Sequence, residues 1–269
     1  MYKIFLLGGV GNNLFQITRA LTLMESGKDV RLLKISKKFV PIYKLICKHK
    51  IHGDWLKLEK FTSELNLEIK ETSFIDIFRL ALIFFHKKLG FTHRFDMSLD
   101  KISNEKLLFS RSLIDVGYFQ SKRHVSVASI IKTSTILKNI LNIDSIRMEK
   151  FVLHLRGGDF SIATRISDTD LRKAALESID QRLDFEIVTD DPKYAEHCTD
   201  NLNIKAKIIS NDPYNDFLSM CSANNLYLSN STFSFWAGNV AKLNGAAKVY
   251  LPDNWSYSFT SEAFKLETR

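Results

Sequence analysis

The residue in this chain best suited to bind a ligand is Arg156, in the sequence HLRGGD at residues 154–159. The apolar run before it predicts a buried strand that the two glycines end. Side chains alternate along a strand, so His154 and Arg156 share one face. Ligands of open α/β sheets bind at the carboxyl ends of strands, and a guanidinium fits two phosphate oxygens. An ordinary strand end, in which Arg156 pairs with Asp159, is the alternative that the residues leave open.

A second candidate site is the sequence SNSTFSFW at residues 229–236, where a strand ends and a helix begins. Hydroxyl groups and backbone N–H groups gather at such a helix start and stabilise an anion. Plain capping of the helix by Ser231 or Thr232 explains the same residues equally well.

Two further motifs have a weaker chemical meaning. The loop GGVGNN at residues 8–13 lacks the G-x-G-x-x-G spacing, and no acidic residue closes the next strand, so a nicotinamide site is disfavoured. We expect its backbone to approach a substrate, and Asn12 or Asn13 to cap the next helix. The pair Asp190-Asp191 precedes Pro192, which favours a helix cap over a metal site. No set of residues has convincing metal-ligand spacing, so we expect no metal.

The elements that must position these motifs alternate between strand and helix. Residues 2–7 and 30–35 read as parallel strands around a helix that begins near residue 14 and ends at Gly27. Residues 151–156, 185–189, 207–209, 226–229 and 248–251 read as strands, with helices at 168–182, 192 onward, 214–223 and 232–243 between them. This alternation predicts a doubly wound α/β fold. Polar residues 142–150 mark a boundary between domains 1–145 and 146–269.

The stretch 36–115 is harder to interpret. Residues Phe74 to Leu89 form an amphipathic pattern with basic residues near its end. An ordinary packed helix is the preferred interpretation, and a helix that lies on a membrane surface is the alternative.

Composition limits the class of protein. The chain has 269 residues, 45 % of them hydrophobic, and a net charge of +8. Its three cysteines lie far apart without a CxxC pair, which fits a reducing compartment. The first residues do not resemble a signal peptide, and no apolar run approaches the length of a membrane span. We therefore expect a cytoplasmic protein. No zinc finger, RNA-binding aromatic pair or basic arm favours nucleic acid as a partner, which leaves an anionic donor or a membrane surface to explain the charge.

Five segments in the same order resemble the α-1,2-fucosyltransferases, whose motif is similar to that of the α-1,6-fucosyltransferases. Residues 154–160 resemble the family's H-x-R-x-G-D-Y. The others are residues 8–16, similar to G-G-L-G-N-Q-M-F-Q; 117–121, similar to G-Y-[FW]-Q-S; 230–237, similar to N-S-T-F-S-W-W-A; and 248–255, similar to a closing strand and P-x-x-W. Together they span the chain.

The resemblance implies a GT-B-like fold of two facing Rossmann-like α/β domains. The C-terminal domain would bind GDP-fucose as the donor substrate, and the N-terminal domain would hold much of the acceptor. Catalysis would be inverting and would need no metal or other cofactor. By position, Arg156 would hold the diphosphate, His154 would lie near the guanine, and Asp216 would be a guanine-binding acid. The implied catalytic residues are Arg156 and Asp159, and the implied substrate-binding residues are Gly9, Gly11, Asn12, Asn13, His154, Asp190, Asp216, Asn230, Ser231, Thr232 and Phe233.

The resemblance also implies the reaction. L-Fucose would move to a hydroxyl, the 2-OH of a galactose-type residue, in a surface glycan such as a lipopolysaccharide O-antigen. The oligosaccharide acceptor could be carried on a lipid at the inner membrane, with the protein in peripheral contact. Gly157 departs from the family, which commonly has Arg there, and Lys122, Arg123 or Arg165 could supply the missing charge. Gly157 keeps open a transferase for another GDP-deoxysugar, and a non-catalytic GDP-sugar-binding module is the other alternative.

Overall fold

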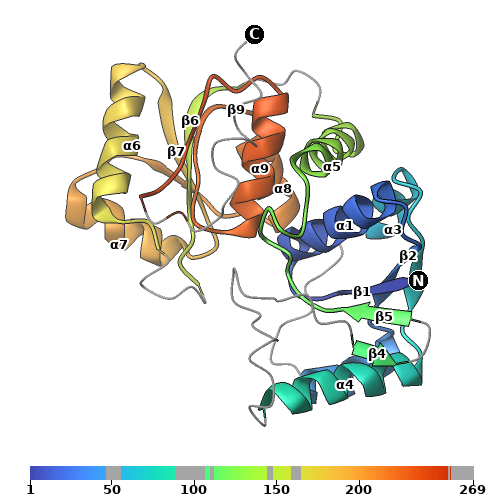
Figure 1. Cartoon of the computed structure of the whole chain (residues 1–269). Helices are drawn as coiled ribbons and strands as arrows, with labels where there is room; N and C mark the ends of the chain where they lie inside the picture. Colours follow the sequence, from blue (N-terminus) through green and yellow to red (C-terminus); the bar gives the residue numbers. More distant parts are fainter. Residues whose placement is uncertain are drawn as a thin grey trace. The chain divides into compact units, whose positions relative to one another are not determined.

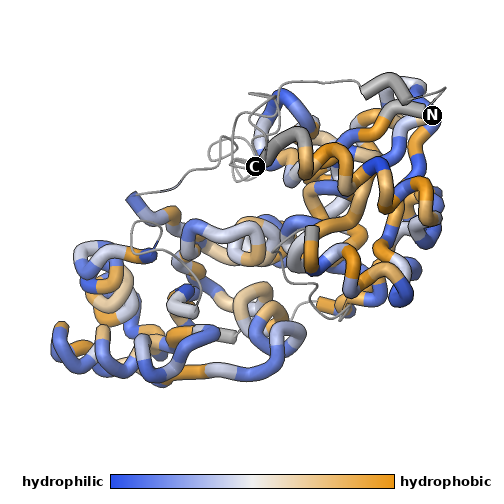
Figure 2. The backbone as a smooth tube through the Cα atoms, turned by 90° about the horizontal axis from the view of Figure 1, so that it is seen from below, coloured by the Kyte–Doolittle hydropathy of each residue, from blue (hydrophilic) through white to orange (hydrophobic). Residues whose placement is uncertain are grey.

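The computed structural model describes residues 1–46, 56–88, 107–109, 112–143, 148–158, 165–253 and 255. The chain divides into two compact α/β units, Met1–Ile130 and Ile131–Arg269 (Figure 1). Apolar segments run through the secondary structure of both units (Figure 2), as two separate hydrophobic cores require.

The first unit is built on a five-stranded sheet in the order β3-β2-β1-β5-β4, parallel except for β4. Its strands are β1 (Tyr2–Leu6), β2 (Val30–Lys34), β3 (Ile69–Glu71), β4 (Leu107–Phe109) and β5 (Ser112–Asp115), and its helices are α1 (Val10–Glu25), the 3-10 helix η1 (Lys37–Phe39), α2 (Val40–Ile46), α3 (Leu58–Ser63) and α4 (Phe74–Lys88). Helices α1 and α4 lie on opposite sides of this sheet (Figure 1). Phe5 and Leu7 pack against Tyr43 of α2 and Leu80 of α4.

Helix α1 begins earlier than the sequence predicts. Gly9 is its N-cap residue and makes no side-chain cap hydrogen bond, so the prediction that Asn12 or Asn13 caps the helix is wrong. Both asparagines already lie inside the helix, and their side chains bond to neighbouring segments instead: Asn12 accepts a hydrogen bond from Gln120, and Asn13 donates to the carbonyl of Leu7. At the other end, Gly27 has a φ of 76° directly after the C-cap, the left-handed conformation that ends helices.

The second unit is built on a five-stranded, fully parallel sheet in the order β10-β9-β6-β7-β8. Its strands are β6 (Met148–Leu155), β7 (Asp184–Thr189), β8 (Lys207–Ile209), β9 (Ala223–Tyr227) and β10 (Lys248–Tyr250), and its helices are α6 (Asp168–Asp180), α7 (Pro192–Leu202), α8 (Pro213–Cys221) and α9 (Thr232–Leu243). Helix α5 (Val127–Ile140) spans the division between the units. Helices α6 and α7 lie on one side of this sheet, and α8 and α9 on the other (Figure 1).

Alternation along β6 decides which side chains face which helices. Phe151, Leu153 and Leu155 belong to a core that includes Leu171 of α6 and Ala195 of α7. His154 points to the opposite face and contacts Ser234 of α9. The strand pattern therefore places one polar side chain under α9, next to the end of the strand.

The mixed α/β architecture, with one fully parallel sheet and one that is parallel except for β4, confirms the predicted fold class of two Rossmann-like α/β units. The predicted helix at 232–243 and the predicted strand at 207–209 have the observed bounds. Among the described residues, no helix is long and apolar enough to cross a lipid bilayer.

Candidate functional site

The strand order of the second unit indicates a candidate ligand site. The connection from β6 to β7 runs through α6 on one face, and the connection from β9 to β10 runs through α9 on the other. Neighbouring strands whose connections leave in opposite directions open a crevice at their carboxyl ends. Arg156 follows β6 at this point, and Ser229 to Ser231 follow β9.

Arg156 is held by an acid from a third strand. Its Nε atom lies 3.0 Å from Oδ2 of Asp190, which directly follows β7. The other carboxylate oxygen, Oδ1, accepts the backbone N–H of Gly157 at 3.0 Å. One carboxylate thus fixes both the side chain at the end of β6 and the turn behind it. Asp159, the predicted alternative partner and candidate base, lies outside the described residues.

The two glycines after Arg156 leave no room for side chains. A Cβ atom on Gly158 would lie 2.7 Å from Oδ2 of Asp190, the oxygen that pairs with Arg156. A Cβ atom on Gly157 would lie 2.7 Å from Cβ of Asp191 and 2.9 Å from the ring of Tyr194. The close approach of the start of α7 to the end of β6 therefore favours glycine at 157, whereas a side chain at 158 would displace the carboxylate of Asp190.

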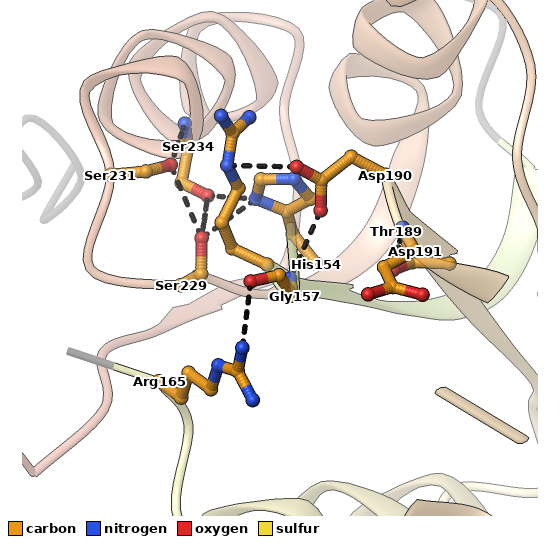
Figure 3. Close-up of polar contacts among 10 residues, drawn as sticks. His154, Gly157, Arg165, Thr189, Asp190, Asp191, Ser229, Ser231 and Ser234 are labelled. Atoms are coloured by element: carbon orange, nitrogen blue, oxygen red, sulfur yellow. Dashed lines mark hydrogen bonds and ion pairs between the residues drawn. The ribbon is translucent and has the colours of Figure 1, made fainter. Parts of the chain in front are cut away.

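Asp191 has the role that its position before Pro192 predicts. Its carboxylate accepts the backbone N–H of Tyr194 at 3.1 Å and caps α7, with Pro192 in the first turn. The two neighbouring acids therefore have different roles. Asp191 caps the start of α7, and Asp190 contacts Arg156 and the backbone N–H of Gly157 (Figure 3).

A buried cluster of hydroxyl groups joins β6 to the start of α9 (Figure 3). Nδ1 of His154 lies 2.8 Å from Oγ of Ser229 and also contacts Oγ of Ser234. Ser231 caps α9, because its Oγ accepts the backbone N–H of Ser234 at 3.1 Å. The cluster ties the end of β6 to the helix start on the other side of the crevice.

His154 is uncharged in the folded protein. Its side chain is only 3 % exposed. Burial, and secondarily the positive charge of Arg156, lowers the pKa of His154 from 6.5 to about 3. A neutral imidazole suits a hydrogen-bonded position between serine hydroxyls, whereas an imidazolium ion there would lie beside Arg156 without water. The predicted contact of His154 with a guanine base remains a prediction.

The start of α9 has the features of an anion site. Its first turn contains no acidic residue. Asn230 and Ser231 are buried, whereas Thr232 and Phe233 are partly exposed at the crevice edge. The N–H groups of a first helical turn have no partner within the helix and carry its positive dipole end. The structure thus brings Arg156 and the predicted residues 230–233 to one edge.

The predicted acid Asp216 lies on the next helix. It sits in the first turn of α8, is mostly buried, and accepts the backbone N–H of Asn211 at 3.0 Å. Burial raises the pKa of Asp216, and the charges of Asp212 and Asp190 raise it further. Beside it, the ring of Phe233 packs edge-on against Phe217 at 5.2 Å. An acid and a pair of aromatic rings therefore lie together near the start of α8.

In the first unit, the predicted residues Gly9, Gly11, Asn12 and Asn13 follow β1 at the corresponding edge. The residue that sequence reasoning missed is Gln16. It is fully buried, accepts the N–H of Leu7 at 2.9 Å and donates to the carbonyl of Gly117 at 2.9 Å. The signal for it was a polar residue beside Phe15 and Ile17 in an apolar helix.

Comparison with known proteins assigns the family. A family model described as glycosyl transferase family 11 matches residues 102–267, a range that contains Arg156 and α9. The chain belongs to glycosyl transferase family 11. This confirms the resemblance read from the five segments and makes the protein a glycosyltransferase. No curated protein matches its sequence.

Solved structures similar to this family 11 chain are remote in sequence. POFUT1 in complex with GDP has 10 % sequence identity and a TM-score of 0.37, and the match covers 94 % of this chain and 98 % of that chain. POFUT1 in complex with GDP-fucose has 11 % identity and a TM-score of 0.34, with coverage of 94 % and 98 %. The E. coli heptosyltransferase WaaC with ADP has 8 % identity and a TM-score of 0.42, with coverage of 98 % and 95 %.

The family 11 chain carries an arginine beside the position of Gly157. The Arg165 guanidinium donates from Nη2 to the carbonyl of Gly157 at 3.2 Å and lies 4.4 Å from the ring centre of Tyr194. The other two candidates for the missing charge, Lys122 and Arg123, are exposed residues of the first unit. In the described part of the chain, no three His, Cys, Asp or Glu side chains lie close enough together to hold a metal ion.

Proposed function

We propose that this family 11 glycosyltransferase moves L-fucose from GDP-fucose to a hydroxyl group of an acceptor sugar, the 2-OH of a galactose-type residue. The observation that carries the proposal is that Arg156 after β6 and the start of α9 after β9 lie at the carboxyl ends of two neighbouring strands. A guanidinium and the backbone N–H groups of a helix start both suit phosphate oxygens, and the same edge offers both.

The reaction is a single displacement with inversion. The acceptor oxygen attacks the anomeric carbon while the bond from that carbon to the β-phosphate oxygen of GDP breaks. The electron pair leaves with GDP, and the hydroxyl proton passes to a base. Arg156 and the N–H groups at the start of α9 stabilise the growing negative charge on GDP, without a metal. Asp190 holds Nε of Arg156, so the guanidinium is oriented before the donor arrives.

The guanine lies toward α8 in this proposal. Asp216 accepts hydrogen bonds from the base edge, and Phe233 offers it a ring face. His154, neutral and bonded to Ser229, supports the residues that contact the donor. Asn230, Ser231 and Thr232 contact phosphate and sugar.

Asp159 is the candidate base because it is the nearest carboxylate after Arg156 in the sequence. A base is needed in its ionised form, so its loss should remove the acidic limb of the pH–rate profile. An Asp159→Asn enzyme that kept the acidic limb would exclude this role and leave Asp159 as a brace for the turn.

The acceptor lies at the first unit in this proposal, against the segment from Gly9 to Asn13. This segment caps and begins α1 at the carboxyl edge of β1, where Asn12 accepts a hydrogen bond from Gln120 and Asn13 donates one to the carbonyl of Leu7. We assign as acceptor a lipid-linked surface oligosaccharide, such as an O-antigen precursor of lipopolysaccharide, met by a cytoplasmic enzyme at the inner membrane. Acceptor mapping with defined oligosaccharides tests this separately from the donor.

A transferase for another GDP-deoxysugar is the second candidate, and Gly157 favours it. This position commonly carries arginine in relatives, and here the side chain is absent and the ring of Tyr194 fills the space. A different charge distribution around the diphosphate could accompany a different sugar.

Calorimetry with GDP, GDP-fucose and other GDP-linked deoxysugars tests the donor, and Arg156→Ala tests the site. Loss of one charged hydrogen bond costs about 1.5–3 kcal/mol, or roughly tenfold to 150-fold in rate, and Arg156→Ala should lose at least that. Arg172→Ala, at an exposed arginine of α6, is the matched control and should be unchanged. Normal turnover by a folded Arg156→Ala enzyme would refute the assignment. GDP binding without transfer to any acceptor would indicate a binding module instead.

A further inference from the structure

One surface of the first unit is strongly apolar. Six large hydrophobic side chains of α2 and α4 each expose between 42 % and 89 % of their area: Ile42, Leu45, Phe74, Ile75, Phe78 and Phe85. We call these six residues the aromatic face. Scattered apolar side chains are normal on a protein surface, but a contiguous group marks an interaction site.

The aromatic face is continuous because of helix geometry. Phe74, Phe78 and Phe85 are four and seven residues apart, so they lie on one side of α4. The opposite side of the same helix carries Leu80 and Ile83, which are buried. Helix α2 packs beside α4. Helix α4 therefore has two apolar sides, of which the first unit covers one.

Exposed lysines flank the aromatic face, and the acid beside them, Glu71, accepts a hydrogen bond from Oγ of Ser36 at the start of η1. Lys37 and Lys38 of η1 and Lys44 of α2 are exposed. The one acidic residue within η1, α2 and α4 is Asp76, which is 4 % exposed. Its carboxylate is bound to Nζ of Lys3 at 2.8 Å and accepts the N–H of Ser73 at 3.0 Å, so its charge is directed inward. The outward surface of these elements is apolar and positive.

We propose that the aromatic face docks on the surface of an anionic lipid bilayer. Helices with an exposed apolar side and flanking lysines lie in the plane of such a surface, with their apolar side chains below the headgroups. Helix α4 has 15 residues and is about 22 Å long, which suits lying on the bilayer and is too short to cross it.

Docking of the aromatic face would also decide which edge of the first unit's sheet lies near the membrane. Helix α2 and η1 follow the carboxyl end of β2, and α4 follows the carboxyl end of β3. In a parallel sheet these ends lie on the same edge as the end of β1 and its loop at Gly9. Docking would therefore hold the proposed acceptor edge near the headgroups. The docking itself does not rest on the proposed donor or acceptor.

Vesicle co-sedimentation of the full chain tests the apolar part of the proposal. The probes are vesicles of phosphatidylcholine with phosphatidylglycerol and vesicles of phosphatidylcholine alone. The variant Leu45→Ser/Phe85→Ser should bind anionic vesicles at least tenfold more weakly, because each change removes apolar area that enters the bilayer. The matched control is Leu176→Ser/Ile179→Ser on α6, where the original side chains are 60 % and 69 % exposed. The control should bind like the unaltered protein.

The charge part is tested with Lys37→Gln/Lys38→Gln. Two charges removed near an anionic surface should weaken binding about 30-fold at low salt. Lys193→Gln/Lys205→Gln, which neutralises two exposed lysines of the second unit, should have no such effect.

Several results would overturn the proposal. One is equal binding to neutral and anionic vesicles, or no binding to either. Another is loss of binding in the α6 control to the same extent as in the aromatic-face variant. A dimer in sedimentation velocity that Leu45→Ser/Phe85→Ser converts to monomer would assign the face to a second copy of the chain. In every case GDP-sugar calorimetry reports separately on the second unit.

Discussion

The buried imidazole of His154 should make the stability of this protein fall as the pH falls. The pKa of His154 is lowered from 6.5 to about 3 by burial and by the nearby charge of Arg156. The unfolded chain therefore takes up a proton first as the pH drops below 6.5, while the folded chain stays neutral until about pH 3. The stability contributed by the neutral form is present above pH 6.5 and is lost progressively toward pH 3.

The size of the effect follows from the two pKa values. Each unit of pKa difference corresponds to about 1.4 kcal/mol. When the pH falls from 7.5 to 5.0, only about the last 1.5 units, below the unfolded-state pKa of 6.5, change the stability. His154 should therefore lower the free energy of unfolding by about 2 kcal/mol over this range. The substitution His154→Asn removes the titration and keeps a side chain that can hydrogen-bond to Ser229 and Ser234.

Urea unfolding at the two pH values measures the prediction. Other titrating groups, including Asp216 with its raised pKa, act equally in both proteins, so the difference between the pH dependences isolates His154. His154→Asn should lose about 2 kcal/mol less than the unaltered protein on acidification. His197→Asn, at an exposed position of α7, is the control and should retain the full dependence. An identical pH dependence in His154→Asn would show that the ring is not buried and neutral.

Two further predictions concern the turns at the carboxyl ends of β1 and β6. Gly157→Ala should destabilise the protein by about 1–3 kcal/mol, because its Cβ would lie 2.9 Å from the ring of Tyr194; an unchanged midpoint in thermal unfolding would contradict the geometry. Gln16→Leu should cost about 3 kcal/mol, since it leaves the buried N–H of Leu7 and the carbonyl of Gly117 without their partner; urea unfolding measures this, and a loss below 1 kcal/mol would mean that water or a shifted backbone replaces the amide.

Much of the second unit was predictable because its signals are local. Apolar runs bounded by glycines and capping residues indicate strands and helices wherever they occur. The cap at Asp191 and the helix at 232–243 follow from a few adjacent residues. The first unit was less predictable: an ordinary packed helix was expected from residue 74 onward, and α4 is packed on one side but exposes Phe74, Phe78 and Phe85. An apolar helix pattern does not reveal which of its sides finds a partner.

The residues around Arg156 also show that local patterns predict elements but not the contacts between them. Sequence alone identified Arg156 at a strand end and, separately, a hydroxyl-rich helix start at residues 229–236, because alternation and turn residues are properties of a short segment. The partner of Arg156, Asp190, could not be predicted in this way, because the two residues meet only where β6 and β7 lie side by side. Asp190 also accepts the backbone N–H of Gly157, which is 33 residues away in the sequence. The contact of Gln16 with Gly117 spans 101 residues and depended on β5 pairing with β1. Strand order is set by how whole sheets bury their faces, so only the tertiary structure decided which charges and amides meet.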